Sequence, residues 1–279
     1  MAEQLSYCAG LVRTHDHDRF LSALFAPADI RENLWALYAF NIEIARIADM
    51  VSEPLLGEIR LQWWREGIEA VYAGQAARAH PVLQALAQAI KACELPHAAF
   101  DRLMDAHAAD FAPIPHATMA ALEDYIDAAS TGLLRLAAAV TGSSAQNSVL
   151  GHSGMALGLT GLLRNFARHL ARGHICLPAS VMQAGDLKPE NILKRQDGPE
   201  LRRVVQHIAD KAAQHLSQAR CSLPRPERQL LPALLPVSMT DMYLRQIYGP
   251  AYTPFRELEP VPAFRRQIRM VRVILLRRL

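Results

Sequence analysis

Helical periodicity dominates this sequence. Apolar residues recur at intervals of three and four along almost the whole chain, whereas no segment alternates with the period of two that a half-buried strand requires. Several periodic segments open on a proline, which suits the first turn of a helix, and several end at a glycine, which suits the residue after one. The sequence therefore predicts an all-α protein with helices over residues 27–52, 60–72, 81–93, 96–111, 119–141, 147–172, 199–222, 226–248 and 262–279.

Composition fits a single domain over residues 1–279. The chain is 51% hydrophobic, and no linker or charge run divides it. Its four cysteines lack metal-ligand spacing, as expected of reduced thiols, and its start lacks the features of a secretory signal. No apolar run approaches membrane-spanning length, and a formal charge of +3 without a nucleic-acid motif predicts no nucleic-acid partner. We therefore expect a cytoplasmic protein.

One long stretch of the chain contains no acid. Residues 128–185 include neither Asp nor Glu. Magnesium prefers oxygen ligands and usually meets a diphosphate through one or two carboxylates. This stretch has no carboxylate to offer, so a metal-diphosphate site on it is not expected.

The centre of this stretch carries a motif. Residues 155–169 read Met-Ala-Leu-Gly-Leu-Thr-Gly-Leu-Leu-Arg-Asn-Phe-Ala-Arg-His, and residues 172–178 read Arg-Gly-His-Ile-Cys-Leu-Pro. Together they resemble the second signature of the squalene/phytoene synthase family, roughly A-x-Q-L-T-N-x-L-R-D-x-x-x-D-x-x-x-G-R-x-Y-L-P. The two aspartates of that signature fall at Asn165 and His169, and its Gln and Asn fall at Gly158 and Gly161. The motif keeps its scaffold and lacks its ligands.

The first signature of the same family is altered in a similar way. Residues 37–53, Leu-Tyr-Ala-Phe-Asn-Ile-Glu-Ile-Ala-Arg-Ile-Ala-Asp-Met-Val-Ser-Glu, are similar to the pattern L-Y-A-F-C-R-x-x-D-D-x-x-D-E. The outer aspartates of that pattern share a helix face and correspond here to Ala48 and Ser52. Asp49 and Glu53 remain beside them, four residues apart and rotated about 100° around the helix. They are a weak alternative metal site, directed away from the cavity.

The resemblance extends over nearly the whole chain. Residues 16–20 (Asp-His-Asp-Arg-Phe), 24–27 (Leu-Phe-Ala-Pro) and 60–64 (Arg-Leu-Gln-Trp-Trp) look less like catalytic synthases than like a divergent branch of the family. That branch includes a mitochondrial respiratory complex I assembly factor. The resemblance implies an isoprenoid-synthase-type helical bundle around a central cavity.

Two functions of different classes follow from the resemblance. The first is a non-catalytic interaction or assembly factor, a pseudoenzyme that needs no cofactor and binds a protein partner such as subunits of a respiratory complex. The alternative is a head-to-head prenyl-diphosphate transferase of isoprenoid biosynthesis, which needs clustered Mg²⁺ between two carboxylate faces. A lipid or isoprenoid carrier that uses the emptied cavity is a third hypothesis. No acid stands at positions 48, 52, 165 and 169, which favours the first function.

Three arginines form a basic stripe on the second-signature helix. Arg164, Arg168 and Arg172 recur every four residues and therefore share a face. They are candidates to bind a phosphate or carboxylate directly through bidentate hydrogen bonds. The favoured interpretation is that they are solvated or paired with acids such as Glu43, Asp49 and Glu53. Arg164 lies on an otherwise apolar turn, where a buried guanidinium requires a partner.

Adjacent tryptophans mark another segment. Trp63 and Trp64 point about 100° apart on a helix, so we expect one of them in the core. The other packs in the core, is partly exposed, lines the cavity or faces a partner.

The C-terminal segment is strongly basic. Residues 265–279 are rich in arginine, lack acids and carry Ile268, Val271, Ile274 and Leu275 at helical spacing. A basic amphipathic helix over about 262–279 suits an anionic membrane surface or a partner groove, which would place the protein peripherally at the inner face of the membrane. The slightly favoured alternative is a terminal helix that docks on the bundle with its arginines in solvent.

Overall fold

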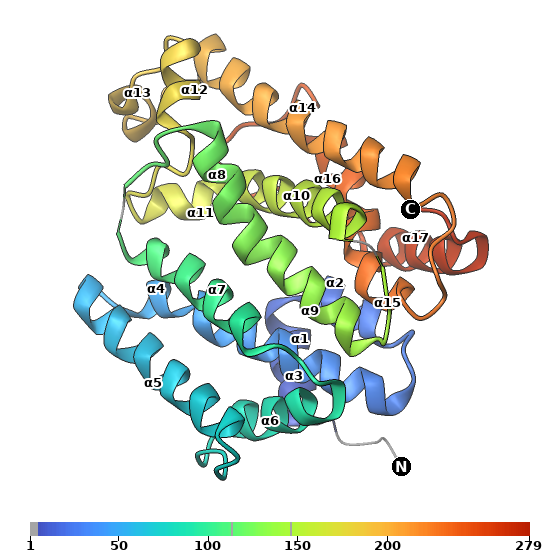
Figure 1. Cartoon of the computed structure of the whole chain (residues 1–279). Coiled ribbons are helices and arrows are strands. Elements are labelled where there is room, and N and C mark those ends of the chain that lie inside the picture. The colour runs from blue at the N-terminus through green and yellow to red at the C-terminus, as the bar shows by residue number, and fades with distance from the viewer. Residues whose placement is uncertain (1–4, 113, 146) are drawn as a thin grey trace.

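The computed structural model describes residues 5–112, 114–145 and 147–279, and every regular element in these ranges is helical (Figure 1). The all-α prediction is confirmed. The first half contains α1 (Tyr7–His15), α2 (His17–Ala23), α3 (Ala28–Ala45), α4 (Ile47–Met50), α5 (Pro54–Tyr72), α6 (Pro81–Cys93), α7 (His97–Ala108), η1 (Ala109–Phe111), α8 (Met119–Ile126), η2 (Asp127–Thr131) and α9 (Gly132–Val140). The second half contains α10 (Asn147–Arg164), α11 (Phe166–Ala171), α12 (Ala179–Ala184), α13 (Pro189–Leu193), α14 (Pro199–Ser222), α15 (Leu231–Leu234), η3 (Leu235–Met239), α16 (Thr240–Ile247) and α17 (Ala263–Leu276).

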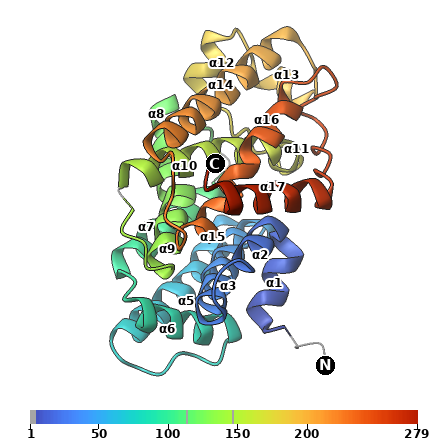
Figure 2. The ribbon, with the colours of Figure 1, turned by 90° about the vertical axis from the view of Figure 1, so that its right-hand side faces the viewer.

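Two central helices organise the bundle. α3 is apolar on nearly all sides, with Leu34, Leu37, Phe40 and Ile44 fully buried, and it packs against α1, α6 and α9. A helix without a polar face belongs in a core. α10 has the same role in the second half, where it packs along α14 and against η2 and α16 (Figure 2). The remaining helices surround these two.

The first-signature segment departs from its predicted helix. α3 ends at Ala45, and α4 adds one turn before the chain becomes extended at Val51. The predicted helix over 27–52 is therefore wrong beyond Met50. Pro54 begins α5, ahead of the start at Arg60 that the sequence predicted. A proline loses nothing in the first turn, because the amide there has no partner within the helix.

The second-signature helix is divided. α10 ends at Arg164, and Asn165 has non-helical angles (φ −94°, ψ 6°) before α11 resumes. The elements α8, η2 and α9 form one continuous rod in which η2 is π-helical. Such a segment inserts an extra residue into a turn and is frequent at functional sites. Gly142 and Gly173, which follow α9 and α11, adopt positive φ values of 69° and 77° that other residues avoid.

The helix predicted over 226–248 is replaced by α15, η3 and α16. Pro232 and Pro236 explain the difference, because each lacks an amide donor for a continuous helix. α15 and η3 are nevertheless fully buried, α16 is buried along one side, and the three elements form a platform for the C-terminal helix.

The C-terminal helix α17 docks on this platform with one face. Met270 and Val273 are buried against Leu231, Leu235 and Met239. Arginines on the edges of this face reach acceptors on the bundle: Arg266 donates to Asp18, Arg269 to the carbonyl of Ser238, and Arg277 to the carbonyl of Pro226. The alternative of a terminal helix that docks on the bundle therefore describes one face of α17.

The other face of α17 is exposed and apolar. Most of the predicted apolar stripe points outward: Ile268, Val271 and Leu275 are 63%, 45% and 75% exposed. Phe264 is exposed on the same face. Only Ile274 of that stripe packs against the core. None of the helices described has the length and apolar character needed to cross a membrane.

Candidate functional site

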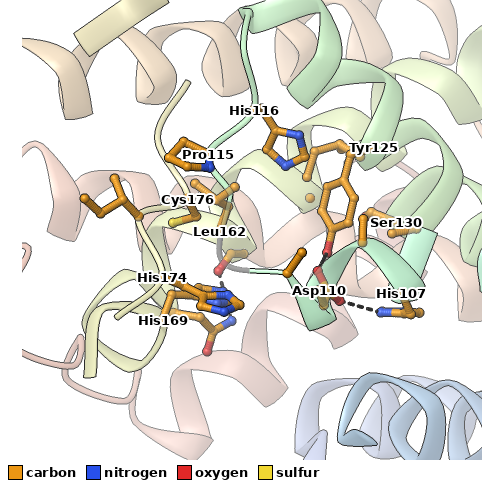
Figure 3. A pocket seen from close by; sticks show the side chains of 18 of the residues that line it. His107, Asp110, Pro115, His116, Tyr125, Ser130, Leu162, His169, His174 and Cys176 are labelled. Carbon is orange, nitrogen blue, oxygen red and sulfur yellow. Dashed lines mark hydrogen bonds and ion pairs between the residues drawn. The ribbon is translucent and has the colours of Figure 1, made fainter. Parts of the chain in front are cut away.

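A cavity of about 540 Å³ opens where the two halves of the bundle meet (Figure 3). α2 and α3 contribute Arg19 and Asn41, and α10 with α11 contributes Gly158, Gly161, Leu162, Asn165 and His169. The rod formed by α8, η2 and α9 supplies another wall, and the segment from α7 to His116 closes a side. The cavity is therefore lined from both halves of the chain.

Two glycines of α10 shape this space differently. A Cβ atom on Gly158 would lie 2.4 Å from Ile126 and 2.8 Å from Ser130, so its absence allows α10 to pack closely against the α8–η2 rod. A Cβ atom on Gly161 would meet nothing within 4 Å. In the signature these two positions carry Gln and Asn. Here Gly158 packs against the rod, and Gly161 leaves open space without a polar group.

The polar wall is centred on Asp110. Its carboxylate accepts a hydrogen bond from the Tyr125 hydroxyl at 2.9 Å and is paired with His107 Nδ1 at 2.9 Å. Burial and the neighbouring Asp110 carboxylate raise the pKa of Tyr125 well above its usual value, so the phenol stays protonated and donates. Both oxygens of this acid are thus already engaged by the protein.

Histidines face this acid from across the cavity. Figure 3 shows His169 and His174 on one side, with Tyr125, Asp110 and His107 on the other. Burial lowers the pKa of His169, and burial also lowers the pKa of His116, which lies beside Tyr125. Because both imidazoles are neutral near pH 7, they contribute hydrogen-bond donors and acceptors rather than positive charge.

Of the four positions where the family signatures carry aspartates, two line the cavity and two do not. Asn165 and His169 line the cavity, and the Asn165 amide donates to the carbonyl of Gly161 at 2.9 Å. Ala48 and Ser52 are not among the cavity-lining residues: Ala48 packs against the core and Ser52 is exposed. The second signature therefore faces the cavity at these positions, whereas the equivalent part of the first does not.

The proposed helical relationship between Asp49 and Glu53 does not exist. α4 ends at Met50, and Glu53 precedes the first residue of α5 in an extended conformation. The Asp49 carboxylate forms an ion pair with Arg172 instead. Within the described ranges, no group of three or more His, Cys, Asp or Glu side chains is placed to hold a metal ion.

Each arginine of the basic stripe meets an acid. Arg172 pairs with Asp49, one of the acids expected to neutralise the stripe, and Arg168 lies 3.8 Å from Glu257. Arg164 lies 4.0 Å from Asp18 and stacks over the Tyr243 ring at 3.7 Å. None of the three belongs to the lining of the cavity. All three guanidinium groups thus lie beside acids and outside the lining of the cavity.

Sequence reasoning missed most of the polar wall. His107, Asp110, His116 and Tyr125 belong to no signature, and they converge only because α7, η1 and α8 fold against one another. A weak signal was available: Asp110 is an acid near the end of a largely apolar predicted helix over 96–111.

Comparison with known proteins gives consistent results. The model of the family described as Squalene/phytoene synthase matches residues 12–272. The chain is 30% identical over 243 residues to NADH dehydrogenase (ubiquinone) complex I, assembly factor 6, of Rattus norvegicus, covering 86% of this chain and 73% of that protein. It is 26% identical over 207 residues to phytoene synthase of Thermus thermophilus, covering 72% of this chain and 68% of the relative.

Solved structures share the architecture. Squalene synthase HpnC from Alicyclobacillus acidocaldarius has a TM-score of 0.73 and 26% identity, covering 87% of this chain and 94% of that one. A dehydrosqualene synthase in complex with a ligand has a TM-score of 0.81 and 19% identity, covering 96% and 94%, and therefore supports the fold alone. The predicted family, its assembly-factor-like branch and the helical bundle are confirmed.

Proposed function

Because the chain belongs to the squalene/phytoene synthase family, we propose that it is a non-catalytic assembly factor that binds a protein partner instead of condensing isoprenoid diphosphates. One observation carries this proposal. Asn165 and His169 occupy the cavity wall at the signature's acid positions, while the first-signature acid Asp49 is paired with Arg172. Condensation requires the charge of a departing diphosphate to be neutralised by metal ions held between carboxylates. The described lining of this cavity does not provide two facing groups of carboxylates.

The remaining acid of the cavity lining also supports function without a cofactor. Asp110 is the carboxylate of the cavity lining, and it already has Tyr125 and His107 as partners. A Mg²⁺ ion bound there would displace these contacts, and the other polar side chains of this wall are imidazoles and a phenol rather than carboxylates. Mg²⁺ belongs only to the alternative in which the protein is a prenyltransferase, which the similarity to phytoene synthase supports more weakly.

The partner is proposed from the relatives. The rat and human proteins are both named complex I assembly factor 6, at 30% and 28% identity. Subunits of a respiratory complex or of its assembly intermediates are therefore the proposed partners. Such subunits act at a membrane, and the exposed apolar face of α17 with its flanking arginines supports peripheral attachment at the inner membrane face.

A turnover assay tests the catalytic half of this proposal. Purified protein, Mg²⁺ or Mn²⁺, and farnesyl or geranylgeranyl diphosphate should release no pyrophosphate above the level without protein. Squalene, phytoene or presqualene diphosphate formed in quantity would establish the transferase instead.

Co-purification tests the assembly half. Full-length tagged protein isolated from its native host should recover subunits of a respiratory complex, and deletion of the gene should lower the amount of assembled complex. Recovery of carotenoid or hopanoid enzymes with normal respiratory complexes would contradict the proposal.

A further inference from the structure

Ten of the seventeen large apolar side chains that are exposed in the described part of the chain gather on two surfaces. One is the outer face of α17, and the other lies on α4 and α5. We call the second surface the α5 face; it consists of Met50, Leu55, Leu56, Ile59 and Trp63. Contiguous exposed apolar patches mark interaction sites on soluble domains.

The α5 face is a continuous stripe. Leu55, Ile59 and Trp63 recur every four residues, so they lie one above the other on the side of α5 opposite the buried Leu61. Leu55 and Ile59 are 66% and 58% exposed, whereas Leu61 is fully buried. The helix is thus apolar on two sides, and the bundle covers only one of them.

Trp63 is held in place at one end of this stripe. Its ring lies edge-on to Trp64 at 5.1 Å and to His80 at 5.6 Å, and the Arg78 guanidinium stacks over it at 5.4 Å. Arg78 also donates to the Trp63 carbonyl at 3.2 Å and pairs with Glu66 at 2.8 Å. A partner therefore meets a tryptophan that has little conformational freedom to lose, and such residues dominate binding energies.

A small pocket of about 270 Å³ opens beside this tryptophan. Ile47, Met50, Trp63 and Trp64 give it apolar walls, and Arg60 and Glu43 stand at its edge. Apolar pockets beside an aromatic residue accept the anchoring side chain of a helix that lies in a groove. The surface thus offers a stripe for several residues of a partner and a recess for one of them.

Acids predominate around the α5 face. The charged residues of α5 and of the segments beside this face are five glutamates and three arginines, namely Glu43, Glu53, Glu58, Glu66, Glu69, Arg60, Arg65 and Arg78, and two of these arginines already have acidic partners, Arg65 in Asp105 and Arg78 in Glu66. Glu58 and Glu69 have no ion-pair partner among the residues described. Such a surface repels an anionic membrane and attracts basic side chains. This distinguishes it from α17, which carries arginines and no acid.

We propose that the α5 face binds an amphipathic helix of a partner protein, with an aliphatic or aromatic anchor in the pocket beside Trp63 and lysines or arginines on its flank. The proposal rests on the assembly function and specifies the surface through which the partner is held. α5 and α17 lie at opposite edges of the molecule (Figure 1), so the protein can hold this helix while α17 faces another surface.

Synthetic peptides test the chemistry of the site. The probe is a helical peptide with leucine at positions i, i+4, i+7 and i+11 and lysines on one flank, and its matched control carries glutamates in place of the lysines. The full-length protein should bind the lysine peptide saturably and at least about tenfold more tightly than the control. Ile59→Glu and Trp63→Ala should each weaken binding about tenfold or more, whereas Ile268→Glu on α17 should not.

Photo-crosslinking tests the occupant in the native host. A photoreactive phenylalanine analogue replaces Ile59 in the full-length protein, and the same analogue at the exposed Gln218 of α14 is the control. The segment captured from position 59 should be a helix with an apolar stripe and a basic flank. Capture of lipid, of a second copy of this chain or of an acidic segment would overturn the proposal, as would capture equal to that of the control.

These outcomes are separable from those of the assembly function. Equal binding of both peptides, or binding that Ile59→Glu leaves unchanged, overturns the α5 proposal even if respiratory subunits co-purify. Pyrophosphate release from prenyl diphosphates would overturn the non-catalytic function and leave the peptide result intact. Circular dichroism and melting temperature of Ile59→Glu, a surface substitution, verify that the variant is folded.

Discussion

Arg266 of α17 donates a hydrogen bond of 2.6 Å to Asp18 of α2, joining two residues from opposite ends of the chain. Asp18 also accepts from the Tyr243 hydroxyl at 2.9 Å. Both members of the ion pair are largely shielded from solvent, with side-chain exposures of 15% and 11%. The contact ties the last helix to the segment that precedes the first signature.

Arg266→Ala should lower the free energy of unfolding by about 1–3 kcal/mol, because it leaves the buried Asp18 carboxylate without its best partner. Urea unfolding measures the change. Arg265→Ala removes a neighbouring exposed arginine and should stay within about 0.5 kcal/mol of the original protein. Equal stabilities for the two variants would show that α17 is only loosely attached.

The outer face of α17 should control attachment to membranes. Replacing both Ile268 and Leu275 by Glu removes exposed apolar groups and adds negative charge, so flotation with anionic vesicles should be lost while the melting temperature is kept. Met270→Ala is the converse variant. It should keep vesicle binding and lose about 2–5 kcal/mol of stability, because Met270 is fully buried. Failure of the wild-type protein to float with anionic vesicles would contradict the proposed attachment to membranes.

Restoring acids to the second signature should not create an enzyme. The double variant Asn165→Asp, His169→Asp places carboxylates in one cavity wall, but Asp110 across the cavity is already engaged by Tyr125 and His107, and Asp49 remains paired with Arg172. The metal cluster needs both walls, so pyrophosphate release should stay at the level of the original protein. Multiple turnovers by this variant would mean that another acid completes the site.

Magnesium should not stabilise the folded protein. A ligand that binds only the native state raises the melting temperature with its concentration, and Asp49 has an arginine partner where an ion would otherwise bind. Melting curves with Mg²⁺ and with a chelator should therefore coincide. If Mg²⁺ raises the melting temperature, loss of that effect in Asp49→Asn would identify Asp49 as an overlooked ligand.

Stability should fall as the pH drops below about 6.5. Burial lowers the pKa of His116 and His169, so the folded protein takes up these protons at lower pH than the unfolded chain does. Where the unfolded state binds more protons, the free energy of unfolding decreases with decreasing pH. The contribution is complete above the unfolded pKa of about 6.5 and is lost as the pH falls below it.

Urea unfolding at about pH 7.5 and about pH 5.5 measures this dependence. The double variant His116→Gln, His169→Gln should show a smaller decrease between the two values than the original protein. An unchanged difference would mean that these histidines do not contribute to it.

Helices whose ends are encoded locally could be predicted from the sequence. The predicted segments 81–93 and 199–222 coincide with α6 and α14, because a proline opens each one and their apolar stripes are regular. The division of the segment 226–248 into three short elements could not be predicted. Its prolines signal breaks, but only burial against α17 and α2 decides that the short pieces between them remain helical.

The site divides in the same way. Asn165 and His169 lie in the cavity wall, as the motif spacing of the second signature indicates, whereas the same reasoning fails for Ala48 and Ser52 of the first signature, which lie outside it. Asp110 and Tyr125 could not, because their contact arises from tertiary packing across the loop between η1 and α8. The partners of Arg164 could not be predicted either, because Asp18 and Tyr243 come from distant parts of the chain and meet only in the folded bundle.

The pairing of Arg172 with Asp49 has a consequence for regulation. Carboxylates on two facing helices repel one another until a cation arrives, so an arrangement of that kind changes with the supply of the ion. A guanidinium is built into the polypeptide and keeps its charge at every physiological pH. The link between the two signature segments is thus formed by the chain itself, and we expect this protein to have the same shape in a magnesium-starved cell as in a replete one.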